Sequence, residues 1–154
     1  MEAPLKLWGG RFQEGPSETF QRFSWSLHFD RRLFEADIAG SKAWARALAR
    51  AGVLTRPEAE TICAALDRVP PPPPDAPDED VHTYVIRMLG ELAGGLASRL
   101  HTGRSRNEQV SLDTRLWLRG EIDRIAGLLR GLMGALLGQA DAHVSTVIPG
   151  YTHL

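Results

Sequence analysis

The sequence predicts an all-α protein. In most of the chain, apolar residues recur every three or four positions, which is the spacing of one helix face. Several of these segments begin at a helix-capping residue and end at glycine, and none alternates apolar and polar residues as a half-buried strand does. We expect an N-terminal helical domain over residues 1–106 and, over residues 107–154, the first long helix of an incomplete multi-helix bundle.

The composition is that of an ordinary soluble domain. The 154 residues are 43% hydrophobic and 24% charged, which is enough for one domain with a core. The net charge of −1 argues against nucleic acid or an anionic membrane as a partner. Cys63 is the only cysteine, and no apolar stretch has the length of a signal core or a membrane span. We therefore expect a cytoplasmic protein.

The first fifty residues are expected to form an irregular arm and one helix. Residues 1–25 lack helical periodicity and contain several glycines. Asp30 is a good N-cap for a helix that runs to about Ala51, and Gly52 supplies the left-handed residue that ends it. One face of this helix carries four apolar residues and a serine, namely Phe34, Ile38, Ser41, Ala45 and Leu48.

A capping box marks the second helix. Thr55 is followed by Pro57 in the first turn and by Glu58 three positions later, and the helix continues to about Arg68. Residues 70–74 are consecutive prolines, which favour extended polyproline over helix or central strand. We interpret this run as a spacer between helices, and docking into an aromatic groove is the alternative.

A third helix is expected over about residues 80–93, ended by Gly94-Gly95, and a long helix over about residues 107–142. The long helix carries an apolar seam with spacings of four and three, formed by Leu118, Ile122, Ile125, Leu129, Leu132 and Leu136. A glycine stripe lies about 200° away around the helix, formed by Gly127, Gly131, Gly134 and Gly138. Two stripes predict a helix buried on two sides in a bundle. Compositional drift towards glycine is the alternative.

The segment His101–Asn107, hereafter the polar run, lies where the long helix is expected to begin. It supplies two guanidinium groups, an imidazole, two hydroxyls, an amide and a glycine, and it has no aliphatic side chain. Amides at a helix start attract anions, and arginine matches carboxylates in bidentate fashion. The polar run therefore predicts a binding site for an anionic ligand, and a solvated loop is the alternative.

Two other segments carry groups able to perform chemistry. Ser26 and Asp30 stand four residues apart near a helix start, and Thr152 precedes His153 after a Pro-Gly turn. The five histidines show no metal-ligand spacing, and neither a nucleotide-binding fingerprint nor a nucleophile elbow is present. These features favour an acid–base enzyme that acts on a small polyanion.

Six segments, in this order, resemble the argininosuccinate lyase family of the fumarase and aspartase superfamily. They are Trp8–Phe12, Ser26–Leu33, Asp37–Ser41, Glu79–Thr83, the polar run continued to Val110, and Pro149–Leu154. The matches cover nearly the whole chain, which therefore resembles the N-terminal part of such a lyase.

The resemblance implies reversible elimination of argininosuccinate to arginine and fumarate by a homotetramer that needs no metal or organic cofactor. It implies that Ser26, Asn107 and Thr152 contact the substrate and that His153 serves in proton transfer. Developing carboxylate charge requires preorganised donors, which the amides of the helix start and the side chains of Arg104, Ser105, Arg106 and Asn107 are expected to supply.

The chain departs from the family pattern at Trp44, Ile86 and Glu108, where His or Tyr, Glu and Asp respectively are usual. The family chain also continues beyond this segment and supplies a mobile loop with a serine assigned to proton transfer. We therefore expect the isolated chain to be inactive. The alternative to a part of an active lyase is a truncated, non-catalytic remnant that acts through helix packing. A different superfamily lyase, such as one acting on adenylosuccinate, is disfavoured by the Trp8–Phe12 segment and the polar run.

Overall fold

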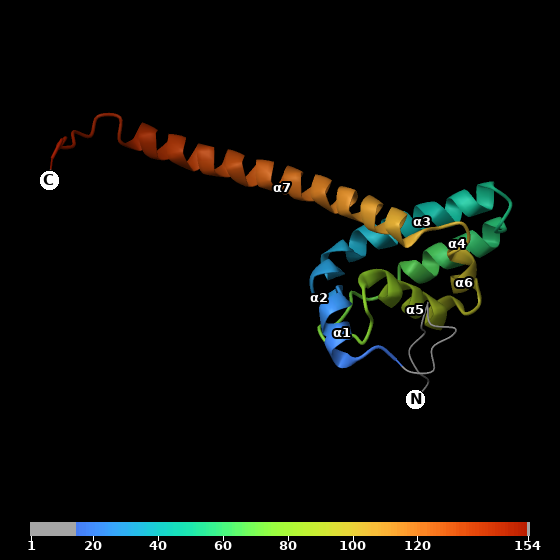
Figure 1. Cartoon of the computed structure of the whole chain (residues 1–154). Helices are drawn as coiled ribbons and strands as arrows, with labels where there is room; N and C mark the ends of the chain where they lie inside the picture. Colours follow the sequence, from blue (N-terminus) through green and yellow to red (C-terminus); the bar gives the residue numbers. More distant parts are fainter. Residues whose placement is uncertain (1–14, 154) are drawn as a thin grey trace. The chain divides into compact units, whose positions relative to one another are not determined.

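The computed structural model of the protein describes residues 15–153, and every regular element in that range is helical (Figure 1). The all-α prediction is therefore confirmed. The elements are α1 (Glu18–Ser24), α2 (Leu27–Asp30), the 3-10 helix η1 (Arg31–Leu33), α3 (Phe34–Arg50), α4 (Arg56–Leu66), α5 (Val81–Ala93), α6 (Leu96–Leu100) and α7 (Arg106–Ala142). They fall into two compact units, Met1–Trp117 and Leu118–Leu154, and α7 contributes to both. Among the described residues, no helix combines the length and the apolar character that a membrane crossing requires.

The core of the first unit lies where α3, α4, α5 and α6 pack together. Each helix places apolar side chains inside, and the fully buried ones are Ala45, Ile62, Ala65, Leu66, Val81, Val85, Leu89 and Leu100. The predicted apolar face of α3 is confirmed, since its four apolar residues and Ser41 are all buried. Leu100 is the last residue before the polar run, so the run begins from a fixed point in the core.

Helix caps set the starts of α4 and α5. The capping box of α4 is confirmed, because Glu58 Oε2 accepts a hydrogen bond from Thr55 N at 2.7 Å while Thr55 Oγ1 accepts from Glu58 N. Asp80 caps α5 by accepting from Thr83 N at 2.7 Å. These two caps fix where the chain enters the helices that flank the proline run.

The prediction that Asp30 caps α3 is wrong. The 3-10 helix η1 joins α2 to α3 without a break, and the backbone N–H of Phe34 already donates to the Arg31 carbonyl. The Asp30 carboxylate instead accepts from the backbone N of Val81 at 3.1 Å, at the start of α5. Asp30 thus joins two segments that are distant in sequence.

Short helices lie where none was expected, and besides α2 they are α1 and α6. The prediction of an irregular arm is wrong for α1, where Ser17 Oγ accepts from Phe20 N at 3.3 Å; the rest of that prediction, on residues 1–14, lies outside the described residues. After α5, Gly94 adopts a positive φ of 56° and ends the helix, but α6 follows before the polar run. Both helices are too short to show a full period of apolar residues.

The proline run has no regular secondary structure up to Pro73, enters a turn at Pro74 and is held by the fold. Arg31 Nη2 donates to the Pro72 carbonyl at 2.5 Å, and the Tyr84 hydroxyl donates to the Pro70 carbonyl at 3.0 Å. Pro72 is buried. These contacts hold the run between α4 and α5, in agreement with a spacer, while the other four prolines are exposed and the docking alternative stays untested.

The second unit contains the C-terminal part of α7 and the segment that follows it. The predicted long helix is confirmed by α7. Side chains of the apolar seam are 47–61% exposed. At each position of the glycine stripe, an added Cβ would meet no atom of the described residues within 4 Å. Both stripes are therefore open surfaces in this chain, and their burial in a bundle stays a prediction.

Candidate active site

The polar run turns the chain from α6 into α7. Gly103 adopts a positive φ of 65°, which residues with a side chain rarely tolerate. Ser105 and Glu108 then close the start of α7, because Ser105 Oγ accepts from Asn107 N at 3.3 Å and Glu108 Oε2 accepts from Ser105 N at 3.2 Å. Glu108, a departure from the family pattern, therefore fits the capping box of this helix.

A second departure also supports the polar run. The indole nitrogen of Trp44, on α3, donates to the carbonyl of Thr102 at 3.3 Å. Ile86, the third departure, is buried in the core on α5.

Burial, followed by the positive charges of Arg104 and Arg106, lowers the pKa of His101, so this imidazole is neutral near pH 7.

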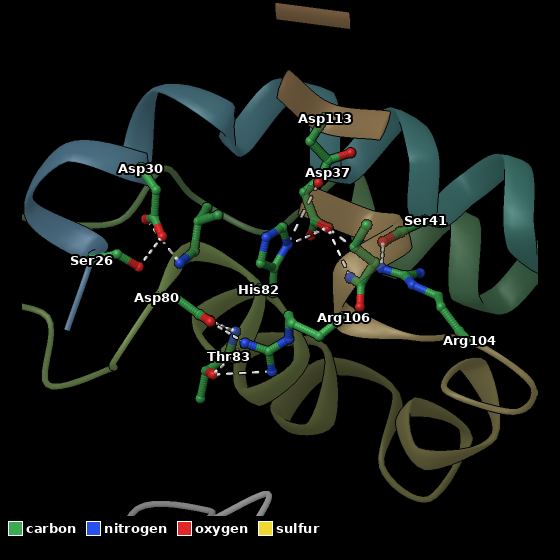
Figure 2. A network of polar contacts seen from close by, with 12 residues as sticks. Ser26, Asp30, Asp37, Ser41, Asp80, His82, Thr83, Arg104, Arg106 and Asp113 are labelled. Atoms are coloured by element: carbon green, nitrogen blue, oxygen red, sulfur yellow. Dashed lines mark hydrogen bonds and ion pairs between the residues drawn. The ribbon is translucent and has the colours of Figure 1, made fainter. Parts of the chain in front are cut away.

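A cavity of about 470 Å³ lies beside Ser26 in the first unit. Its lining comes from α2, η1, α7 and the residues at the start of α5, and consists of Ser26, Phe29, Asp30, Arg32, Leu33, Asp80, His82, Val110, Thr114 and Trp117. Ser26 Oγ donates to Asp30 Oδ2 at 2.5 Å (Figure 2). Burial raises the pKa of the Asp30 carboxyl, although the hydrogen bond from Ser26 acts in the opposite direction. The Ser26 hydroxyl is thus held at the wall of a cavity that can admit a small molecule.

Arg106 is anchored beside this cavity. It forms a hydrogen-bonded ion pair with Asp80 and lies within 3.4 Å of Thr83 Oγ1 through Nη2. Asp80 itself lines the cavity, so the arginine contributes positive charge near one wall (Figure 2). Asn107, the next residue, is exposed, and its side chain makes no hydrogen bond within residues 15–153. Its amide is available to a ligand.

Behind the polar run lies a buried cluster of polar side chains, formed by Asp37, Ser41, His82, Arg104, Gln109 and Asp113 (Figure 2). Asp37 Oδ1 is 3.0 Å from His82 Nδ1 and accepts from Gln109 Nε2 at 3.1 Å. Arg104 Nη2 donates to Ser41 Oγ at 3.0 Å and lies 3.4 Å from Asp37 Oδ1. The cluster joins α3, α5, the polar run and α7.

The two carboxyl groups of the buried cluster differ in pKa. Burial alone would raise the pKa of Asp37, but its contacts with His82, Arg104 and Gln109 outweigh burial and lower it. For Asp113, burial and then the charge of Asp37 raise the pKa to about 7. Burial lowers the pKa of Arg104, opposed by Asp37 and Asp113. The cluster therefore centres on an ionised Asp37 beside the Arg104 guanidinium.

Sequence reasoning missed this cluster. It found no metal-ligand spacing, yet the fold brings ligand atoms of Asp37, His82 and Asp113 within 4.8 Å of one another. Arg104 already places positive charge against the same Asp37 oxygen, so a metal cation there would meet like charge. The one available signal was a polar Ser41 on the otherwise apolar face of α3.

The structure brings together some predicted site residues. Ser26 lines the cavity, and Arg106 lies next to it through Asp80. Ser105 and Asn107 are exposed on the polar run. The side chain of Arg104 is only 7% exposed and belongs to the buried cluster.

Thr152 and His153 belong to the second unit, where both are exposed. The roles assigned to all of these residues stay predictions.

Comparison with known proteins places the chain in a family. A family model described as lyase matches residues 10–154. The argininosuccinate lyase of Solibacter usitatus is 54% identical, covering 97% of this chain and 34% of the relative. That of Roseiflexus castenholzii is 48% identical, covering 96% and 34%. The probable argininosuccinate lyase of Schizosaccharomyces pombe is 42% identical, covering 100% and 35%. The chain thus spans about a third of the length of these curated relatives, and it belongs to the lyase family.

Proposed function

We propose that the chain forms part of an argininosuccinate lyase, which cleaves argininosuccinate reversibly to arginine and fumarate. The observation that carries this proposal is the convergence of three sequence segments on one cavity. Ser26, Asp80 and the first turns of α7 come from separate parts of the chain and meet there. The names of the relatives, at 42–54% identity, agree with this activity.

The proposed reaction breaks a carbon–nitrogen bond and forms a carbon–carbon double bond. A base removes a proton from the carbon next to a carboxylate, negative charge develops on that carboxylate, and the departing guanidinium nitrogen receives a proton. Donors fixed before reaction stabilise such charge best. Ser26, Arg106 and Asn107, with the amides at the start of α7, are the proposed donors.

The remaining predicted residues keep their proposed roles. Ser105 offers a hydroxyl on the exposed side of the polar run, and Thr152 contacts substrate in the complete site. His153 takes part in proton transfer, since imidazole exchanges protons near neutral pH. Arg104 contributes through its positive charge from within the buried cluster.

The working enzyme is proposed to be a cytoplasmic homotetramer. The apolar seam of α7 supports assembly, because an exposed apolar stripe of this length is typical of a helix with packing partners. The same seam favours the second candidate function, a non-catalytic protein that acts only through helix packing. The two candidates differ in whether assembly is accompanied by turnover.

Fumarate release from argininosuccinate tests the proposal. The chain is assayed alone, mixed with the portion of a homologous lyase that it does not span, and joined to that portion in one polypeptide. We expect no release from the chain alone, release from the single polypeptide, and partial recovery on mixing. Assembly without release in both combined samples would favour the packing function instead.

A further inference from the structure

One carboxylate oxygen in the buried cluster serves three partners. Asp37 Oδ1 lies 3.0 Å from His82 Nδ1, 3.1 Å from Gln109 Nε2 and 3.4 Å from Arg104 Nη2. These partners are 45, 72 and 67 residues away in sequence. A single atom of α3 therefore joins α5, the polar run and the first turns of α7.

These contacts lie on both sides of Ser105–Asn107, the exposed part of the proposed site. Arg104 immediately precedes Ser105, which caps α7, and Gln109 follows Asn107 by two residues. The chain between the two anchors has little freedom once both are bound to Asp37. Because Nε and Nη1 of Arg104 are buried without an acceptor among the described residues, Asp37 supplies most of the countercharge that keeps this guanidinium in place.

The second carboxyl of the cluster has a different environment. Asp113 is 1% exposed, as is Asp37, and its Oδ2 lies 3.5 Å from His82 Nδ1. Carboxylate oxygens of Asp37 and Asp113 lie within 4.8 Å of each other. Two ionised carboxylates at this distance repel each other, and a proton on one of them allows a hydrogen bond instead. Asp37 has more donors, which lower its pKa and keep it ionised, whereas the pKa of about 7 keeps the Asp113 carboxyl mostly protonated below that pH.

We propose that Asp37 is a positioning residue of the lyase site, whose ionised carboxylate orients Ser105–Asn107 through Arg104 and Gln109, with Asp113 as its neutral partner. The part of this proposal that concerns catalysis rests on the proposed function. The part that concerns the polar run is independent of it. Asp37 acts through other residues and need not touch the substrate.

Two isosteric substitutions separate the roles of the carboxyl groups. Asp37→Asn removes the charge that holds Arg104, whereas Asp113→Asn keeps a neutral donor in place of a protonated carboxyl. Hydrogen exchange is measured in this chain for the amides of residues 102–109. We expect exchange at least tenfold faster in Asp37→Asn and within twofold of the unchanged chain in Asp113→Asn, with α4 amides unchanged in both. Equal effects of the two substitutions, or unchanged exchange in Asp37→Asn, would overturn the proposal.

Should Asp37→Asn fail to fold, Ser41→Ala provides the test. It removes the hydrogen bond at 3.0 Å between Arg104 Nη2 and Ser41 Oγ while Asp37 stays intact. We expect a smaller increase in exchange, confined to residues 103–106. No increase there would refute positioning through Arg104.

Kinetics in the joined polypeptide test the consequence for catalysis. We expect Asp37→Asn to lower kcat/KM at least tenfold, with the larger share in KM, because the polar run binds carboxylates. Asp67→Asn, the same chemical change at an exposed residue of another ion pair, is the control and is expected to stay within twofold. A fall in kcat alone would contradict the proposal. If the unsubstituted polypeptide itself releases no fumarate, the lyase function fails, and the exchange measurement still decides whether Asp37 positions the run.

Discussion

The two units of the chain differ in how far their side chains are buried. In the first unit, even the carboxyl groups of Asp37 and Asp113 are buried, and four helices share one core. In the second unit, the apolar seam is about half exposed. The first unit therefore has the contacts that a folded domain needs, whereas the second presents an apolar pattern that the described residues leave exposed. Apolar periodicity indicates that a helix face is made for burial, but not what covers it.

The helix α7 shows this difference along its own length. Its two buried residues, Gln109 and Asp113, are both polar and stand one turn apart. From Leu118 onward the same helix has a regular apolar seam that is exposed. The buried end thus carries part of the polar cluster, whereas the exposed end carries an apolar seam that the described residues do not cover.

The largest expected effect comes from a matched pair of leucines. Leu89 is fully buried in the first unit and Leu129 is 55% exposed in the second. Leu89→Ala should lower the free energy of unfolding by about 3 kcal/mol, because truncating a buried leucine leaves a cavity in the packed core. Leu129→Ala should change it by less than about 0.5 kcal/mol. Urea denaturation of both variants measures this, and equal losses would show that the seam is covered within the chain.

Next in size is Asn107→Ala in the joined polypeptide. Removing an amide that faces the substrate should lower turnover at least about tenfold, which corresponds to about 1.4 kcal/mol of transition-state stabilisation. Assembly should be unchanged, because Asn107 is exposed and its side chain has no hydrogen bond among the described residues. Fumarate release is measured together with oligomer mass by light scattering. Turnover equal to that of the unsubstituted protein would remove Asn107 from the site.

The third effect, spread over several pH units, is a pH dependence of stability centred on Asp113. Its pKa of about 7 in the folded chain lies above the ordinary value of 3.8, so the unfolded chain loses this proton first as pH rises. The resulting stability is complete below about pH 4 and is lost towards pH 7, with a slope of up to about 1.4 kcal/mol per pH unit. The groups that face Asp113 are Asp37 on α3, His82 on α5 and Arg104 of the polar run.

Asp113→Asn cannot ionise and should lack this slope. The comparison is the difference in unfolding free energy between the variant and the unsubstituted chain, measured by urea denaturation at several values between pH 4.5 and 6.5. Asp37 does not confound it, because its lowered pKa confines its own contribution to pH values below about 4. Parallel curves for the two proteins would mean that Asp113 is ionised throughout.

Local signals in the sequence were sufficient for the longer helices. The capping box at Thr55, the periodic face of α3 and the seam of α7 are each encoded within a few turns, and the structure has all three helices. Short helices were missed, since α1 and α6 have seven and five residues and no full apolar period. Their positions depend on packing and caps rather than on pattern.

The candidate site was only partly predictable. The polar run and Ser26 stand out because unusual residue types cluster in a short segment. The buried cluster does not, because Asp37, His82 and Asp113 lie on three different helices and meet only after folding. Asp30 shows the same limitation, since the partner it caps is the start of α5, fifty-one residues away, and not its own helix.

The proline run affects stability through the unfolded chain. Five consecutive prolines have few backbone conformations to lose, so fixing this segment costs little conformational entropy. The segment leads directly to Asp78, which holds Arg87 at 2.8 Å, and to Asp80, which holds Arg106. A glycine-rich loop of the same length would lose much more conformational entropy when it positions these two aspartates. The stiffness of the prolines therefore helps to keep one wall of the cavity in place before any ligand arrives.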